Sequence, residues 1–193
     1  MKKKTVALLL ALVLVFGVAA GGTLAWLTAK SETVTNTFTA SDINVELTET
    51  GATNNENSYK MIPGYTITKD PEAKVLAGSE ECYLFVKLEK STNFSSFMTY
   101  EMADGWTELT GVDGVYYRVV TKDGRDNTSK INESYSVLKG DQVTVLGTVT
   151  KADMNGLTAA NYPTLKVTAY ASQLYKNNTE TFTPTEAWAN VNA

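Results

Sequence analysis

The sequence predicts an all-β protein, a sandwich or barrel that ends in a short helix and follows a cleaved N-terminal signal helix. Three observations lead to this fold class. A cationic start runs into a long apolar stretch, several later segments alternate apolar and polar residues, and turn residues separate those segments. Alternation with a period of two indicates half-buried strands. Several short strands joined by turns are typical of a sandwich or barrel.

The first element is a secretory signal. Lys2 to Lys4 precede an apolar run from Val6 to Ala20, and small residues follow it. This is the order of a signal peptide. Small residues at positions 23 and 25 place cleavage between Ala25 and Trp26, with a second choice after Ala29. We therefore expect residues 1–25 to be removed on export.

A membrane anchor is the alternative interpretation of the same stretch. From Thr5 to Leu27 it is long enough to cross a bilayer as a helix. Three glycines interrupt it, and no basic stop-transfer cluster follows, which favours the signal. We expect contact with the membrane only through the uncleaved signal.

Composition bounds what the remaining 168 or so residues can bind. Removing the signal leaves 14 basic against 21 acidic residues, a net charge of −7. An acidic chain is poorly suited to nucleic acid or anionic lipid, so we expect neither as a partner. The length fits one domain, residues 41–193, with a core that needs no disulfide.

Cysteine and histidine usage excludes most catalytic chemistry. The chain has one cysteine and no histidine. Cys82 lies in an alternating apolar segment and is predicted to be a buried thiol. Without histidine there is no Ser/His/Asp triad, HExxH zinc motif or ordinary histidine-ligated metal site. We expect no catalytic residue, no metal, no cofactor and no enzymatic activity.

The strands are predicted from alternation. Apolar residues occupy every second position in five segments, and glycine-containing turns such as Asp113-Gly114 lie between them. The segments contain Ile43, Val45 and Leu47; Cys82, Leu84, Val86 and Leu88; Val115, Tyr117 and Val119; Val143, Val145, Gly147 and Val149; and Leu165, Val167, Ala169 and Ala171.

Two segments depart from alternation, and one loop is ambiguous. Residues 151–161 could form a short helix or a crossover loop. At the C-terminus, Thr183, Pro184 and Glu186 have the spacing of a capping box, which predicts a helix that lays Trp188 on the sheet. Residues 123–127 could hold calcium only if their carboxylates converged, and we predict a hairpin turn there.

The region around the signal boundary resembles a known family. The stretches Gly21 to Thr28, Asn36 to Ser41 and Ile43 to Leu47 resemble the N-terminal signature of the TasA and camelysin (CalY) family of Gram-positive bacteria. The resemblance covers about the first quarter of the chain. It implies processing by a signal peptidase of the SipW type and a jelly-roll-like β-sandwich. It also implies a subunit that forms extracellular fibres of a biofilm matrix or decorates the cell surface.

Residues 26–40 form the predicted N-terminal extended segment. Residues 33–39 alternate, have strand propensity and lie next to the newly cut end. Such a segment can add a strand to a neighbouring subunit, with Val34 and Phe38 entering pockets, and this head-to-tail contact would grow a fibre by self-association. Asn36 lies on the same face and weakens the alternative, which is pairing within its own sheet. The sequence leaves both open.

Two other functions compete with a fibre subunit. Camelysin-like members imply a metallopeptidase, but no spacing here suggests an all-carboxylate site. A surface adhesin or carbohydrate-binding module would need exposed aromatic residues gathered on one face. Trp106, Tyr116 and Tyr175 are the candidates, and their burial would argue against this function.

Overall fold

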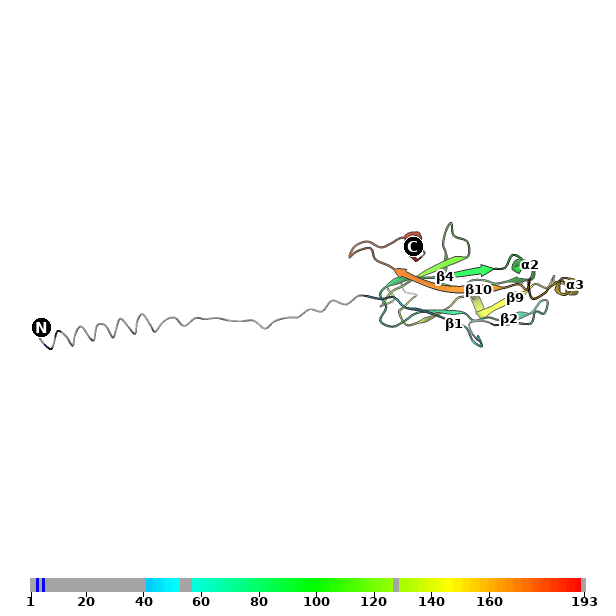
Figure 1. The fold of residues 1–193 in the computed structure, drawn as a ribbon, viewed down its shortest axis with the longest axis horizontal. Coiled ribbons are helices and arrows are strands. Elements are labelled where there is room, and N and C mark those ends of the chain that lie inside the picture. Colours follow the sequence, from blue (N-terminus) through cyan, green and yellow to red (C-terminus); the bar gives the residue numbers. More distant parts are fainter. Residues whose placement is uncertain (1–2, 4, 6–40, 53–56, 127–128, 192–193) are drawn as a thin grey trace. The chain divides into compact units, whose positions relative to one another are not determined.

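The computed structural model describes Lys3, Thr5 and residues 41–52, 57–126 and 129–191 (Figure 1). The predicted cleavage residues Ala25 and Trp26 lie outside these ranges. So do Val34, Asn36 and Phe38 of the predicted donor strand, and all five stay predictions. Within the described ranges, no helix is both long and apolar enough to cross a membrane.

The regular structure of the described residues between 41 and 191 is mostly β, with the strands in three antiparallel sheets. The largest sheet has the order β10-β4-β7-β6, and the other two have the orders β1-β3-β8 and β2-β9-β5. The strands are β1 (Val45–Thr48), β2 (Thr66–Thr68), β3 (Glu72–Val75), β4 (Cys82–Lys90), β5 (Met98–Thr99), β6 (Thr107–Glu108), β7 (Val115–Val120), β8 (Ser134–Ser136), β9 (Gln142–Val145) and β10 (Leu165–Gln173).

Short helices join or cover these sheets. They are α2 (Phe94–Phe97), α3 (Lys151–Asn155), α4 (Pro184–Val191) and the 3₁₀ turn η1 (Lys139–Asp141). α3 confirms that a short helix lies within 151–161, and it begins at a capping box formed by Thr150 and Asp153. Thr183 and Glu186 form the predicted box at the start of α4, with reciprocal bonds of 3.3 and 2.8 Å.

β4 lies at the centre because both of its faces are apolar. Cys82, Leu84 and Val86 point into a core shared with residues of the two smaller sheets, as expected for a sandwich. The cysteine is fully buried, as predicted, and burial raises the pKa of its thiol to about 12. Tyr83 and Phe85 point the other way, into a second apolar cluster.

The second cluster lies under α4. The Trp188 ring is 5.2 Å from the ring of Phe85 and 5.3 Å from that of Tyr170. The C-terminal helix therefore covers the outer face of the four-stranded sheet, which confirms the prediction for Trp188.

Two local predictions are wrong. β9 ends at Val145, so Gly147 and Val149 are not in a strand. The chain turns there because Val149 N–H donates to the Leu146 carbonyl at 3.2 Å.

The segment after β7 is not a hairpin turn either. β7 and β8 belong to different sheets, so the chain crosses between layers, and Thr121 and Lys130 pair in parallel.

Candidate functional site

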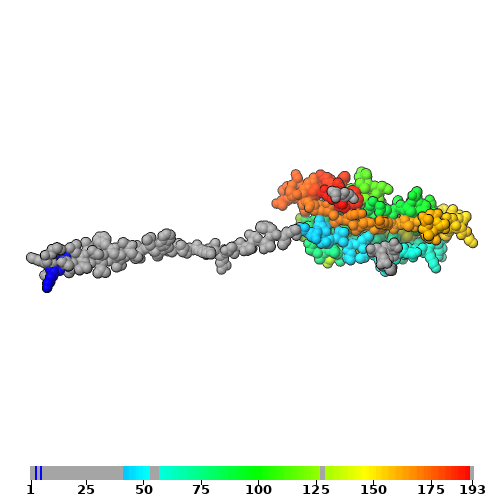
Figure 2. Space-filling view, viewed as in Figure 1, coloured from blue at the N-terminus to red at the C-terminus, as the bar shows by residue number. Residues whose placement is uncertain are grey.

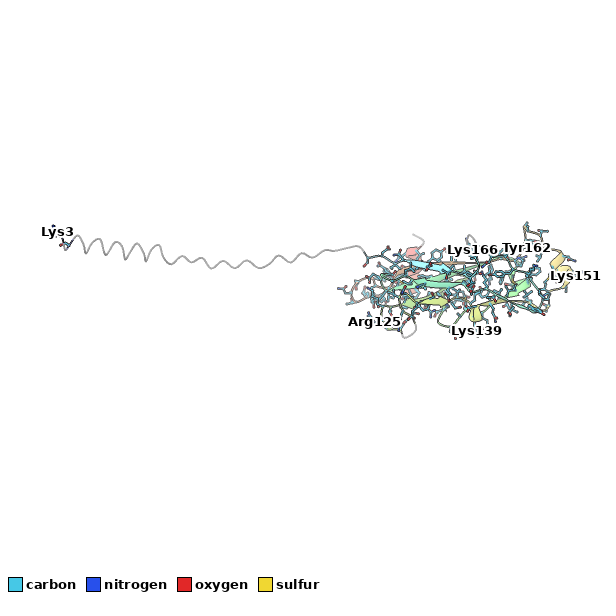
Figure 3. All side chains as sticks on the ribbon, turned by 90° about the horizontal axis from the view of Figure 1, so that it is seen from below. Lys3, Arg125, Lys139, Lys151, Tyr162 and Lys166 are labelled. Carbon is cyan, nitrogen blue, oxygen red and sulfur yellow. The ribbon has the colours of Figure 1, made fainter. Side chains whose placement is uncertain are left out.

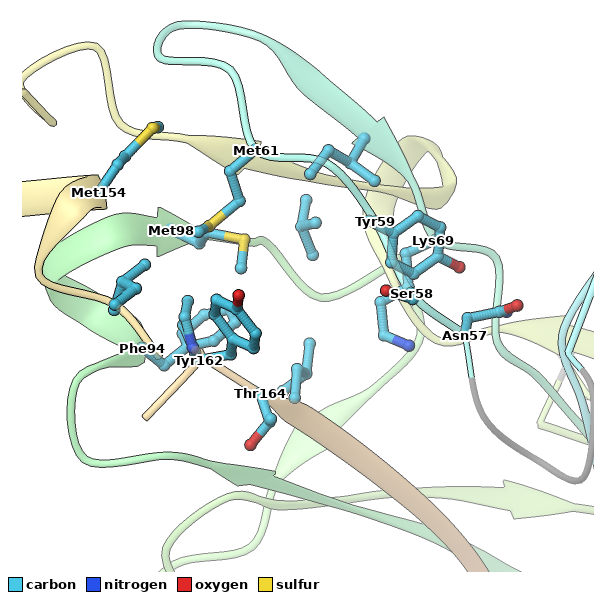
Figure 4. A pocket seen from close by; sticks show the side chains of 15 residues that line it. Asn57, Ser58, Tyr59, Met61, Lys69, Phe94, Met98, Met154, Tyr162 and Thr164 are labelled. Carbon is cyan, nitrogen blue, oxygen red and sulfur yellow. The ribbon is translucent and has the colours of Figure 1, made fainter. Parts of the chain in front are cut away.

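An apolar groove of about 540 Å³ lies in the described part of the domain (Figure 4). Three methionines line it, and Figure 4 shows the side chains of Met61 and Met98 pointing toward one another. Methionine fills irregular space and adapts to different partners. The third methionine is Met154, and the other apolar lining residues are Ile67, Phe94, Val143, Leu157, Pro163 and Leu165.

The walls come from elements far apart in the sequence. β2 and β9 contribute Ile67 and Val143, which are paired in register. The short helix α2 holds Phe94 buried, while α3 contributes Met154. Residues 162–165, which lead into β10, form another wall. The last wall is the segment Asn57–Met61, here called the strap.

A free strand edge borders the groove. In the described residues, β10 pairs only with β4, so the other edge of this nine-residue strand has no ladder partner. β1 lies beside β10 but has only four residues. Figure 2 shows orange β10 along the face of the domain, next to the blue and cyan residues that include β1. An unpaired edge is a template for an added strand.

Exposed apolar side chains occur around the same region. Tyr65 is 64% exposed and Ile62 51% exposed in the turn that precedes β2. Tyr59 belongs to the strap, Tyr162 precedes β10, and both are exposed as well as part of the groove wall. Exposed apolar groups next to a groove are typical of a protein-binding surface.

A polar cluster fixes the strap at one side of the groove. The Glu49 carboxylate accepts hydrogen bonds from Tyr59 Oη at 2.7 Å and from Asn57 Nδ2 at 3.1 Å. Lys69 Nζ donates to both of its oxygens, at 2.8 and 3.1 Å. Burial alone would raise the pKa of Glu49, but these hydrogen bonds outweigh it and lower the pKa. Burial and the carboxylate together raise the pKa of Tyr59.

The groove and Ser41 lie at opposite ends of the described domain. Ser41 Oγ donates to Glu80 just before β4 begins, whereas Leu165 in the groove pairs with Lys90 at the end of β4. A nine-residue strand spans about 26 Å. Arg125 donates to Glu81, the residue before β4, and Figure 3 shows Arg125 and Tyr162 of the groove wall toward opposite ends of the domain.

The aromatic residues considered for sugar binding do not gather on one exposed face. Tyr116 and Trp106 pack against the shared core, and Trp106 Nε1 donates to the Ser136 carbonyl at 2.8 Å. Tyr175 is 37% exposed, beyond the end of β10. Within the described residues, no group of three or more acidic or cysteine side chains is placed to hold a metal ion.

Comparisons with protein-family models, curated proteins and solved structures found no match. The site therefore rests on geometry alone. Sequence reasoning located a possible donor strand but missed the groove. Its methionines, at positions 61, 98 and 154, follow no local pattern, and only the fold brings them together.

Proposed function

We propose that this chain is a secreted structural protein of the bacterial cell surface or biofilm matrix, a TasA-like subunit that forms fibres by donor-strand exchange. A SipW-type peptidase removes residues 1–25, and the freed segment 26–40 of one subunit adds a strand to the next. The domain is a jelly-roll-like sandwich with no catalytic role. The observation that carries the proposal is the groove beside the free edge of β10.

The groove suits a strand with large apolar side chains at alternate positions. A strand added to β10 would find ladder partners along its edge, while Phe38 or Val34 entered the space between Met61 and Phe94. Full burial of a phenylalanine side chain contributes about 1.5–3 kcal/mol. That corresponds to roughly 10- to 100-fold in affinity.

The positions of the two ends favour a linear assembly. Ser41, the first described residue after the extended segment, lies at the end of the domain away from the groove. A donor that leaves one end and an acceptor at the other make a head-to-tail contact. Such a contact repeats without closing when the rotation between subunits does not form a ring.

Variants of both partners test the assembly by electron microscopy and size-exclusion chromatography of the mature protein. Phe38→Asp should abolish fibres, because the carboxylate would be desolvated without a partner. Thr37→Asp is its matched control on the other face of the strand. Met154→Glu should block the groove, whereas Ala152→Glu puts the same charge on an exposed position of α3 outside the groove.

Three outcomes contradict the proposal. Fibres from Phe38→Asp and Met154→Glu would show that assembly uses another surface. Unfolding on deletion of residues 26–39 would make the segment a strand of its own sandwich, since a donor segment should leave a folded monomer. Mass spectrometry of the secreted protein should place the N-terminus between residues 26 and 30, and recovery of Lys2 would favour an anchor.

A further inference from the structure

We propose that Lys69, Glu49 and Asn57 form a self-modification site, in which the lysine amine and the asparagine carboxamide join in an intramolecular amide bond. The amine and the carboxamide converge on one oxygen of the Glu49 carboxylate. Lys69 Nζ and Asn57 Nδ2 each lie 3.1 Å from Glu49 Oε1. The two nitrogens are therefore at most 6.2 Å apart.

The surroundings shield this cluster from water. The side chains of Lys69 and Glu49 are only 13% and 17% exposed. Tyr59 adds a further hydrogen bond to the carboxylate, and Asn57 Nδ2 also donates to the Thr50 carbonyl at 3.3 Å. Reduced contact with water strengthens electrostatic interactions between the groups. Neighbouring charges and hydrogen bonds are also what hold reacting groups in position.

The chemistry needs no oxidant, metal or second substrate. Glu49 accepts a proton from the Lys69 ammonium, which leaves a neutral amine. The nitrogen lone pair attacks Cγ of Asn57, forming the Nζ–Cγ bond, and the Cγ–Nδ2 bond then breaks. Nδ2 leaves as ammonia after taking the proton that Glu49 carries. Nζ, which still holds two hydrogens, then gives its second proton to the regenerated Glu49 carboxylate, from which the ammonia takes it to become ammonium. The net change is a lysine side chain and a carboxamide converted into one secondary amide and one ammonium ion.

Glu49 can serve both proton transfers from its observed position. Lys69 Nζ lies 2.8 Å from Oε2, so the ammonium proton has a direct path to the carboxylate. In the observed orientation Asn57 Nδ2 lies 3.1 Å from Glu49 Oε1, so the protonated carboxyl group can pass its proton to this leaving nitrogen. General acid and base catalysis of this kind contributes about 100- to 10,000-fold.

The strap has the freedom to close the remaining distance. Residues 58–61 make no main-chain hydrogen bond to other described residues, so side chains alone hold this segment. Lys69 follows directly after β2, and its N–H donates to the Asp141 carbonyl at 2.9 Å, which fixes that partner. Bond formation would fix the strap, and with it one wall of the groove, by a covalent link.

The other lysine–carboxylate pairs of the described chain lack the third group. Lys122 lies 2.6 Å from Glu80, whose other partner is the Ser41 hydroxyl. Lys176 lies 2.7 Å from Glu186, which is bonded to Thr183. No carboxamide shares either carboxylate, so no acyl group is available to these amines. The Lys122–Glu80 pair is therefore a natural control.

Peptide mapping of the mature, purified protein tests the bond. Trypsin should release residues 31–60 and 61–69 as separate linear peptides if no bond exists. An acylated Lys69 resists trypsin, so the bond would yield residues 31–60 joined to 61–74. The mass of the joined peptides, like that of the intact protein, should be lower by one ammonia. Linear peptides alone, after long incubation at neutral and mildly alkaline pH, would overturn the proposal.

Variants separate this bond from other losses of ammonia. A succinimide at Asn57 would also lose ammonia but would leave the peptides linear and would persist in Lys69→Arg. Glu49→Gln should slow cross-linking by at least 100-fold, whereas Glu80→Gln should leave it unchanged. Cross-linking at an unaltered rate in Glu49→Gln would overturn the role of that carboxylate. None of these measurements depends on fibre formation, so a negative result would refute the cross-link without refuting the proposed function.

Discussion

At Gly114 a single added methyl group should strongly destabilise the fold, because it would meet the backbone of a neighbouring strand. Its φ is +70°, and a Cβ built there would lie 2.4 Å from the Leu88 carbonyl oxygen of β4. Leu88 N–H donates to the Gly114 carbonyl at 2.8 Å, so the two backbones are fastened together. In Gly114→Ala, left-handed backbone costs about 1–2 kcal/mol. The overlap adds about 1–3 kcal/mol.

Gly111→Ala is the matched control in the same β6–β7 turn. Its φ is +83°, and a Cβ there meets nothing within 4 Å. It should lose only the backbone component, about 1–2 kcal/mol. Urea unfolding of both variants, followed by tryptophan fluorescence, gives the free energies of unfolding. Equal losses in the two variants would refute the argument from the contact with Leu88.

Three further perturbations test the core and the polar cluster. The Cys82 thiol should react with a maleimide only after unfolding, because the side chain is fully buried, and rapid labelling of the native protein would contradict its placement. Trp188→Ala should lower the free energy of unfolding by about 2–4 kcal/mol through lost contacts with Phe85, with a smaller loss in Trp188→Phe. The folded-state pKa of Glu49 lies below its ordinary value of 4.5. Ionised Glu49 therefore stabilises the fold above pH 4.5, and this stabilisation is lost as the pH falls through the folded-state pKa. In urea unfolding at a series of acidic pH values, the free energy of unfolding should fall less steeply for Glu49→Gln than for the unaltered protein.

The alternation of apolar and polar residues predicted the long strands, because these strands pack one face against a core over several repeats. β10 has nine residues and β7 has six, enough for several repeats against a core. α4 was predictable for another reason: its capping box is a local pattern that determines where the helix begins. Elements whose pattern lies within a few consecutive residues could therefore be predicted from the sequence.

The strands that were not predicted are too short to show an alternating pattern. β2 and β8 have three residues each, and β3 reads Glu-Ala-Lys-Val, which alternates only twice. Their pairing is decided by partners across the sandwich. The groove and the cluster around Glu49 depend on the same long-range placement, since Asn57, Lys69 and Met154 converge only in the folded chain.

The difference in length between β1 and β10 explains why the candidate site lies where it does. β1 has four residues and lies beside β10, which has nine, so β1 cannot accompany β10 along its full length. A long uncovered edge invites pairing with any extended chain. Here the beginning of that edge adjoins a groove whose wall is a strap held by side chains. The strand that we propose is supplied by another subunit would remove the free edge by completing the sheet.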